Sequence, residues 1–288
     1  MSTLQYAVHA YAWTPSWSNK CLDLIDRAKG LGFDVIEIPL MEIDLVDPDA
    51  IRARAQYAGI GLCTSTACSE ATDPTGEDEV TRRRGVEYLK KCVKATAAMG
   101  ATVFTGVTYS AMGRRISTMP GEEYRERAAV ALREAASYAR DLGVTVGIEP
   151  INRYESFLVN TCDQALQLKA RIDAPNISIH LDAYHMNIEE NSFYEPTVKA
   201  APYLCHYHLS ESHRGTPGTG TVDWEGIYRA MAKTGYTGMV GMESFSEMSG
   251  AMAAATCIWR RLATSSDELL CRGLAFLRGL EQKHYQQA

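Results

Sequence analysis

The sequence predicts a single α/β barrel of eight strand and helix units, and three observations support this fold class. Short β-like runs alternate with amphipathic helix-like segments along the chain, which is the order typical of a parallel sheet covered by helices. Several helix-to-strand joints carry a glycine at the same place. The length of 288 residues suits one (β/α)₈ barrel, which takes about 250 residues.

Eight segments have the composition of buried strands. Each is short and rich in apolar residues, and each is followed by a change to polar or helical sequence. In chain order they comprise residues 6–12, 34–40, 60–66, 101–107, 144–150, 177–182, 203–210 and 238–244.

Helix-like segments separate these strands. The first, residues 19–31, repeats apolar side chains at helical spacing. A later one has a single apolar stripe formed by Ala128, Ala131, Leu132, Ala135, Ala139 and Leu142. Further helices are expected over residues 48–58 and 77–99, after Thr161, over 195–201, after Asp223, and over about 252–282.

Glycine marks four of the helix-to-strand joints, which read "GLGFDVIEI", "AMGATVFTG", "DLGVTVGIE" and "KTGYTGMVG". A glycine just past a helix can adopt the left-handed conformation that ends the helix and turns the chain. No Gly-x-Gly-x-x-Gly turn follows the first strand, so a dinucleotide-binding open sheet is disfavoured. We expect one domain over residues 1–288, with the helices of about 252–282 packing on the barrel.

Composition excludes several classes of protein. Hydrophobic residues make up 46% and charged residues 22% of the chain, as in globular proteins. No apolar run approaches the roughly 20 residues of a membrane span, and no secretion signal is evident, so a cytoplasmic location is expected. The net charge is −6 and the basic residues form only short clusters, which disfavours nucleic-acid binding. The eight cysteines are scattered without metal-binding spacing.

Acids and histidines stand where the last four strands end. Glu149 follows the fifth, Asp182 ends the sixth, His206 and His208 lie on the seventh, and Glu243 follows the eighth. These ends converge in a barrel, and three carboxylates together favour a bound cation. Oxygen ligands with one imidazole favour Mn²⁺, Mg²⁺ or Co²⁺, with zinc as an alternative. His206 and His208 share one face; we interpret His208, nearer the exit, as the ligand and His206 as a core residue.

The motifs "IEPINRYES", "IHLDAYHMNIEE", "HLSESHRG" followed by "GTGTVDW", and "MESF" resemble the D-tagatose 3-epimerase family of ketose 3-epimerases. The resemblance covers nearly the whole chain and is most specific over residues 147–245. It implies a xylose-isomerase-like TIM barrel with one divalent metal per subunit, Mn²⁺ first and Co²⁺ or Mg²⁺ next, held by Glu149, Asp182, His208 and Glu243.

The resemblance also implies an activity: epimerisation at C3 of free ketoses such as D-tagatose, D-fructose, D-allulose and L-ribulose. The two ligand glutamates would serve as the acid/base pair around a cis-enediolate. Family members are commonly homodimers or homotetramers. By the same match, the residues that hold the C1 and C2 oxygens of the sugar would be Glu155, His185 and Arg214.

Without this resemblance, we would interpret Arg214 as an exposed loop arginine. For His213 and Glu211 we expect exposed loop residues even with the resemblance. Residues of the pocket wall are less readable, because large apolar side chains in a barrel also serve as core. This sequence has Met112 where the tagatose enzyme has tryptophan, and His9 where it has phenylalanine, so the preferred ketose stays open. Candidates for contacts with the sugar are His9, Trp17, Met112 and Phe245.

Three other functions compete with epimerisation. An aldose-ketose isomerase would use the same barrel and enediolate but return the proton to the neighbouring carbon. A metal phosphodiesterase of the apurinic-endonuclease type would need more metal ligands and a basic face for DNA. A non-catalytic barrel would bind ketose and metal without exchanging the C3 proton.

Overall fold

Eight parallel strands close into a barrel, which confirms the predicted fold class. The computed structural model describes residues 3–246 and 250–285; residues 1–2, 247–249 and 286–288 of the predicted domain 1–288 lie outside the described part. Each strand pairs with the next, and β1 pairs with β8. The strands are β1 (Gln5–His9), β2 (Val35–Pro39), β3 (Gly61–Cys68), β4 (Val103–Ala111), β5 (Thr145–Ile148), β6 (Ile177–Asp182), β7 (Leu204–His208) and β8 (Met239–Met242).

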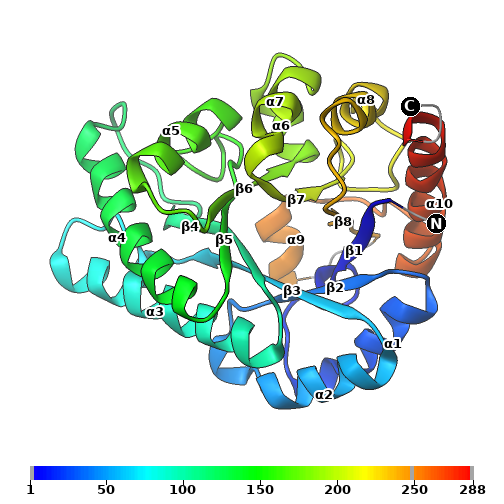
Figure 1. Ribbon diagram of the computed structural model, residues 1–288, viewed down its shortest axis with the longest axis horizontal. Helices are drawn as coiled ribbons and strands as arrows, with labels where there is room; N and C mark the ends of the chain where they lie inside the picture. Colours follow the sequence, from blue (N-terminus) through cyan, green and yellow to red (C-terminus); the bar gives the residue numbers. More distant parts are fainter. Residues whose placement is uncertain (1–2, 247–249, 286–288) are drawn as a thin grey trace.

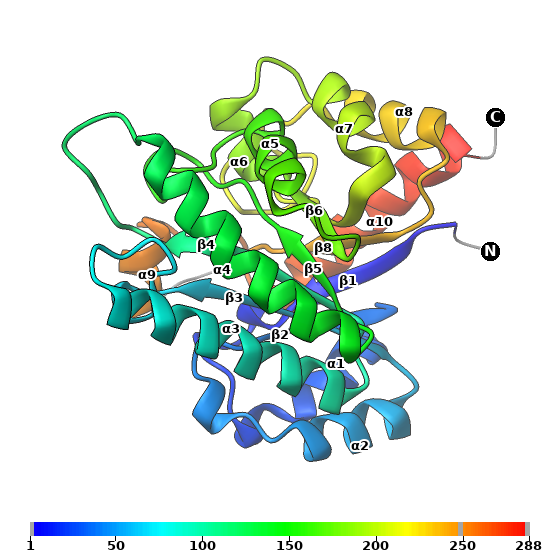
Figure 2. The same cartoon turned by 60° about the vertical axis from the view of Figure 1, so that its left-hand side comes forward.

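Helices surround the strands in both views (Figures 1 and 2). Helix α10 packs against α8, and α9 is seen across the middle of the barrel in Figure 1. The α-helices are α1 (Asp23–Gly30), α2 (Pro48–Ala58), α3 (Glu79–Met99), α4 (Glu122–Asp141), α5 (Cys162–Ile172), α6 (Ala183–Glu189), α7 (Tyr194–Ala200), α8 (Trp224–Thr234), α9 (Gly250–Thr256) and α10 (Ser266–Tyr285). Short 3₁₀ turns are η1 (Ala10–Ala12), η2 (Asn19–Cys21), η3 (Ile43–Leu45), η4 (Glu70–Thr72) and η5 (Ala201–Tyr203).

The glycines at the helix-to-strand joints have the left-handed conformation that the sequence predicts. Their φ angles are +92° at Gly32, +82° at Gly100, +71° at Gly143 and +68° at Gly235. L side chains rarely adopt this region, so glycine is required for the chain to leave each helix at this angle.

Local structure differs from the expectation in several places, and two of them lie at the end of β1 and at the end of α4. The first strand ends at His9 because residues 10–12 turn into η1, where His9 Nδ1 accepts a hydrogen bond from the backbone N–H of Tyr11 at 3.1 Å. The apolar stripe of α4 stops before Leu142, which caps the helix and is 41% exposed. The other stripe residues are buried against the barrel.

The interior of the barrel contains a polar layer as well as apolar side chains. Glu37 of β2, His180 of β6 and His206 of β7 are each completely buried. Buried polar groups need partners because leaving them unpaired costs free energy, so this layer is held by the hydrogen bonds described below. Within the described ranges, no helix combines the length and apolar character needed to cross a bilayer.

Candidate active site at the carboxyl ends of the strands

A cavity of about 270 Å³ opens at the carboxyl ends of the strands. This is the end of a (β/α)₈ barrel where active sites lie. Helix α9 contributes Met252, Ala255 and Thr256 to its wall. Of the residues predicted from the sequence, the cavity is lined by His9, Met112, Glu149, Glu155, His185, His208, Arg214, Glu243 and Phe245.

The four predicted metal ligands gather around one ring nitrogen. His208 Nδ1 lies 4.0 Å from Glu149 Oε1, 3.7 Å from Asp182 Oδ2 and 3.6 Å from Glu243 Oε2. One ligand atom each from Glu149, Asp182 and His208 lie within 4.8 Å of one another. Glu243 stands at the edge of this group, facing His208 and Arg214.

Asp182 connects this group to the helix that follows. It is the last residue of β6 and the N-cap of α6, where its Oδ1 accepts a hydrogen bond from the backbone N–H of Tyr184 at 2.7 Å. Its second oxygen is thereby directed toward His208, and His185 follows one turn into the helix. The sequence analysis did not anticipate α6, although an aspartate before a helical segment is a common N-cap.

Arg214 is buried in the site. Its Nη1 donates hydrogen bonds to Asp182 Oδ2 at 2.8 Å and to Glu243 Oε2 at 2.6 Å. Its guanidinium carbon lies 4.1 Å from the centroid of the Tyr184 ring. The backbone φ of +63° is rare for a residue with a side chain, and such strain persists where the surroundings fix it. The alternative of an exposed loop arginine is wrong.

Glu211 is also buried, so its interpretation as an exposed loop residue is wrong as well. Its Oε1 accepts hydrogen bonds from the N–H of Ser212 at 2.8 Å and of Val222 at 3.2 Å. Its Oε2 accepts from the N–H of Gly218 at 2.9 Å and from the Trp224 indole at 3.1 Å. One carboxylate therefore ties together both ends of the loop that carries Arg214, whereas His213 is half-buried.

The pKa values of Glu149 and Glu243 are shifted in opposite directions by their surroundings. Burial raises the pKa of Glu149 well above its ordinary value, and the negative charges of Asp182 and Glu243 add to this. Burial also disfavours the charged form of Glu243, but Arg214 and His208 outweigh it and hold the pKa of that carboxyl below its ordinary value. The surroundings therefore shift the pKa values of the two glutamates in opposite directions.

The group fits a divalent cation. His208 Nδ1 is buried, has no hydrogen-bond partner among the described residues and faces three carboxylates, which is where a cation would be held. Arg214 supplies one positive charge against the three acids. Carboxylate oxygens with a single imidazole are the donor set that Mn²⁺, Mg²⁺ or Co²⁺ accepts.

Asn152 sets the orientation of His185. Its backbone N–H lies 3.1 Å and its side-chain amide nitrogen 2.9 Å from His185 Nδ1, so Nδ1 accepts and the ring hydrogen lies on Nε2. Burial lowers the pKa of His185, which favours this neutral form. The same amide donates to Glu155 at 2.8 Å. Asn152 was not singled out in the sequence, although it lies in the motif "IEPINRYES".

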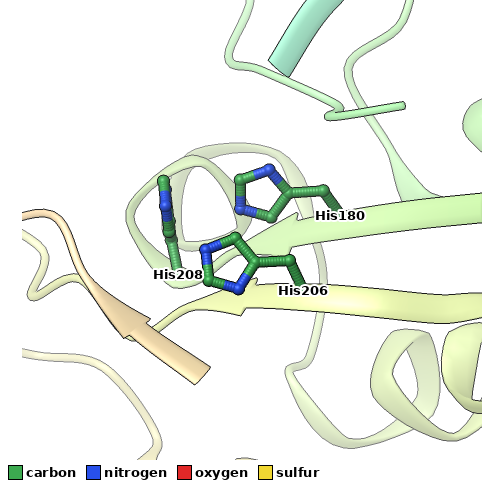
Figure 3. Close-up of side chains that lie close together, drawn as sticks. All are labelled: His180, His206 and His208. Atoms are coloured by element: carbon green, nitrogen blue, oxygen red, sulfur yellow. The ribbon is translucent and has the colours of Figure 1, made fainter. Parts of the chain in front are cut away.

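A second layer of buried groups lies beneath the cluster. Glu37 Oε2 is 2.8 Å from His208 Nε2 and 2.9 Å from His206 Nε2. His180 lies alongside, with ring centroids 4.6 Å from His206 and 4.2 Å from His208 (Figure 3). Sequence reasoning missed Glu37 and His180; the available signals were an acid inside the apolar run "VIEIP" and the two-residue spacing that puts His180 on the face of Asp182.

Trp17 differs from the other predicted pocket residues. Its side chain is 1% exposed and packs in the hydrophobic core, so it does not line the cavity and this prediction is corrected. A tryptophan ring has a large apolar area, and in this protein that area is buried in the hydrophobic core. Met41, which the sequence analysis did not consider, lines the pocket with Met112.

Gly106 forms part of the wall with backbone alone. Its φ is +112°, and an added Cβ would lie 2.1 Å from the carbonyl oxygen of Thr66. Its own carbonyl accepts a hydrogen bond from the N–H of Glu149 at 3.2 Å. The close approach of β3 and β4 at this point therefore requires glycine.

Known proteins are similar to this chain in sequence and in fold. A family model described as a xylose isomerase-like TIM barrel matches residues 25–269. A ketose 3-epimerase of Arthrobacter globiformis is 35% identical over 278 residues, 96% of each chain. An L-ribulose 3-epimerase of Methylomonas sp. (strain DH-1) is 34% identical, covering 96% of this chain and 97% of that protein.

A solved structure of D-allulose 3-epimerase from Methylomonas sp., in complex with D-allulose, superposes with a TM-score of 0.91 at 33% identity; it covers 97% of this chain and 98% of that chain. The resemblance read from the motifs is thus confirmed. The chain belongs to the ketose 3-epimerases, a family of carbohydrate isomerases built on the xylose isomerase-like TIM barrel.

Proposed function

We propose that the protein epimerises free ketoses at C3 with the help of one divalent metal ion. One observation carries the proposal: Glu149 and Glu243 approach the same atom, His208 Nδ1, at 4.0 and 3.6 Å from β5 and β8. Two carboxylates held around one centre are what removal and return of a proton on opposite faces of a carbon requires. The names of the relatives support the same reaction.

The ion would be held by Glu149, Asp182, His208 and Glu243, with Mn²⁺ the first expectation and Co²⁺ or Mg²⁺ the alternatives. When bound, it polarises the ketose carbonyl and lowers the energy of negative charge on the sugar oxygens, an effect worth several kcal/mol. Arg214 is not one of these ligands, so its guanidinium would be able to bind the substrate.

The two glutamates would share the proton transfer. In one direction an ionised glutamate removes the C3 proton and a cis-enediolate forms on the sugar; the other glutamate then gives a proton to the opposite face of C3. Positioned proton transfer contributes about 10²–10⁴-fold in rate.

Arg214, His185 and Glu155 would hold the C1 and C2 end of the ketose. His185 Nε2 carries the ring hydrogen and lies 3.3 Å from Arg214 Nη2, so these two nitrogens are both donors. A substrate oxygen between them would accept hydrogen bonds from both. Glu155, fixed by Asn152, would accept one from a sugar hydroxyl.

The remaining carbons of the sugar would face His9, Met112 and Phe245. These side chains line the cavity together with further apolar groups, which supports substrates of the D-tagatose, D-fructose, D-allulose and L-ribulose class. A homodimer or homotetramer in the cytoplasm completes the proposal, and light scattering of the purified protein measures the assembly.

The test is exchange of the C3 proton in D₂O. Wild-type protein, stripped of metal and reloaded with Mn²⁺, Co²⁺ or Mg²⁺, should incorporate deuterium at C3 of D-fructose or L-ribulose and release a new ketose; the stripped protein should not. Glu149→Gln and Glu243→Gln should each lower exchange about 10²–10⁴-fold. Formation of an aldose would instead identify an aldose-ketose isomerase.

A matched control is Glu281→Gln. Glu281 is a buried acid at the other end of the barrel, where it accepts hydrogen bonds from the N–H of Thr3 and Leu4. This variant should keep wild-type exchange. A wild-type rate in either Glu149→Gln or Glu243→Gln would rule out the two-base scheme.

A further inference from the structure

Glu37 is a buried acid with no part in the chemistry described so far. It lies in the middle of β2 and is completely buried. Its side chain crosses the barrel interior to β7, where Oε2 lies 2.9 Å from His206 Nε2 and 2.8 Å from His208 Nε2. An ionised carboxylate only accepts hydrogen bonds, so each of these ring nitrogens carries a hydrogen.

We propose that Glu37 is the positioning residue of the metal centre: by accepting the Nε2–H of His208, it fixes the tautomer and ring angle that direct the Nδ1 lone pair to the ion. The inference rests on the proposed metal site. Histidine ligands commonly donate their second ring N–H to a carboxylate, which orients the ring and makes the ligand more basic.

The opposite nitrogen of the same ring agrees with this role. His208 Nδ1 is buried, faces three carboxylates at 3.6 to 4.0 Å, and has no hydrogen-bond partner among the described residues. A buried ring nitrogen in such surroundings serves as a ligand when it presents a lone pair. Glu37 holds one hydrogen at Nε2, so Nδ1 is the nitrogen that can give a lone pair to the ion.

The three histidines of Figure 3 could themselves be taken for a metal site, since His180, His206 and His208 offer ligand atoms within 4.8 Å of one another. The hydrogen bonds of these rings favour a supporting role instead. The Nε2 atoms of His206 and His208 are used as donors, and His180 Nδ1 lies 2.9 Å from Thr105 Oγ1. The trio is therefore the support of the centre above it.

His206 stabilises the position of Glu37. It shares Oε2 with His208, and both rings come from β7, two residues apart. The other carboxylate oxygen, Oε1, lies 3.5 Å from His9 Nε2 and is not hydrogen-bonded to a described residue. The carboxylate is therefore held by the same strand that carries the ligand it orients.

Two substitutions of Glu37 distinguish the loss of its negative charge from the loss of its hydrogen-bond acceptor. Glu37→Gln keeps an acceptor oxygen but loses the charge, and we expect about 10-fold weaker Mn²⁺ binding; Glu37→Leu removes the acceptor, and we expect about 100-fold weaker binding. Titration calorimetry on metal-stripped protein measures both. Loss of the buried acceptor should lower the thermal midpoint of the stripped Glu37→Leu protein, and in both variants the further rise on adding Mn²⁺ should be smaller than in the wild type.

Glu281→Gln is again the control and should bind Mn²⁺ as the wild type does. A second measurement needs no variant: in Mg²⁺-loaded wild-type protein with ¹⁵N-labelled histidine, NMR should show a hydrogen on Nε2 and none on Nδ1 of His208. Unchanged Mn²⁺ affinity in Glu37→Leu, or a His208 with Nε2 bare, would overturn the inference. Wild-type protein that binds no ion would instead contradict the metal site itself.

Discussion

Strands β5 to β8 and strands β1 to β4 build the same pocket from different chemical groups. At their carboxyl ends the later strands present Glu149, Asp182, His208 and Glu243, and the loop after β7 adds Arg214. The earlier strands and their loops contribute mostly residues of the pocket wall, among them His9, Met41, Gly106 and Met112. The later strands thus carry most of the reaction centre, with Glu37 of β2 beneath it, whereas the wall takes residues from both halves, Phe245 among them. Changes at the carboxylates should affect rate, and changes in the wall should affect substrate preference.

The largest effect that would sharpen this comparison is expected at Arg214. Arg214→Lys keeps the charge but loses the planar guanidinium, whose Nη1 donates to both Asp182 and Glu243 while its Nη2 lies beside His185. A hydrogen bond to a charged group is worth about 1.5–3 kcal/mol, so kcat/KM should fall roughly 10–100-fold for every ketose alike. Steady-state kinetics on two ketoses measures the change.

Arg27→Lys is the matched control, because Arg27 also donates hydrogen bonds to a carboxylate, that of Asp267, but on the surface. It should leave kcat/KM unchanged. A loss in Arg214→Lys confined to one ketose would assign Arg214 to shape and break the division between the reaction centre and the wall.

The next effect concerns stability. Glu211 ties the loop of Arg214 to the start of α8. Glu211→Gln should lower the free energy of unfolding by about 1–3 kcal/mol, because an acceptor of four donors is weakened. Urea denaturation at neutral pH measures the difference.

This difference should depend on pH. Burial raises the pKa of Glu211, but its hydrogen-bond donors outweigh burial and the pKa lies below its ordinary value. Its stabilising contribution is therefore complete above the unfolded pKa of about 4.3 and is lost as pH falls through the lower, folded pKa. Wild type and variant should converge only when the pH falls below the folded pKa of Glu211; a gap that persists in stronger acid would show that ionisation of Glu211 does not matter.

The smallest effect is expected in the wall. Met112 is 36% exposed at the pocket, and a larger ring there should disfavour six-carbon relative to five-carbon ketoses. Met112→Trp should change the ratio of the two kcat/KM values by about 10-fold, the size of a change of one methylene in an apolar pocket. Met119→Trp, in the same loop but 88% exposed, should leave the ratio as it is; equal ratios in the two variants would remove Met112 from the pocket's specificity.

Much of the fold was predictable because its signals are local. The joint glycines, such as Gly32 and Gly100, are required by a backbone angle, and Glu149 and Glu243 follow strands that the sequence outlines. The contacts of Glu37 were not predictable in this way, since its partners lie 169 and 171 residues away across the barrel.

Other errors came from single side chains whose type has two equally good uses. Trp17 is as suitable for core as for a pocket, and only packing decides. Glu211 looked exposed because it lies in a polar loop, yet that loop folds around it and supplies the donors.

The backbone wall at Gly106 limits how relatives of this protein can diversify. A Cβ at position 106 would collide with the carbonyl of Thr66, so no substitution there can narrow the pocket without moving β3 or β4. Strand β4 is also hydrogen-bonded to Glu149 through the carbonyl of Gly106. New sugar preferences should therefore arise by exchanging side chains at the rim, while the width between β3 and β4 is inherited unchanged.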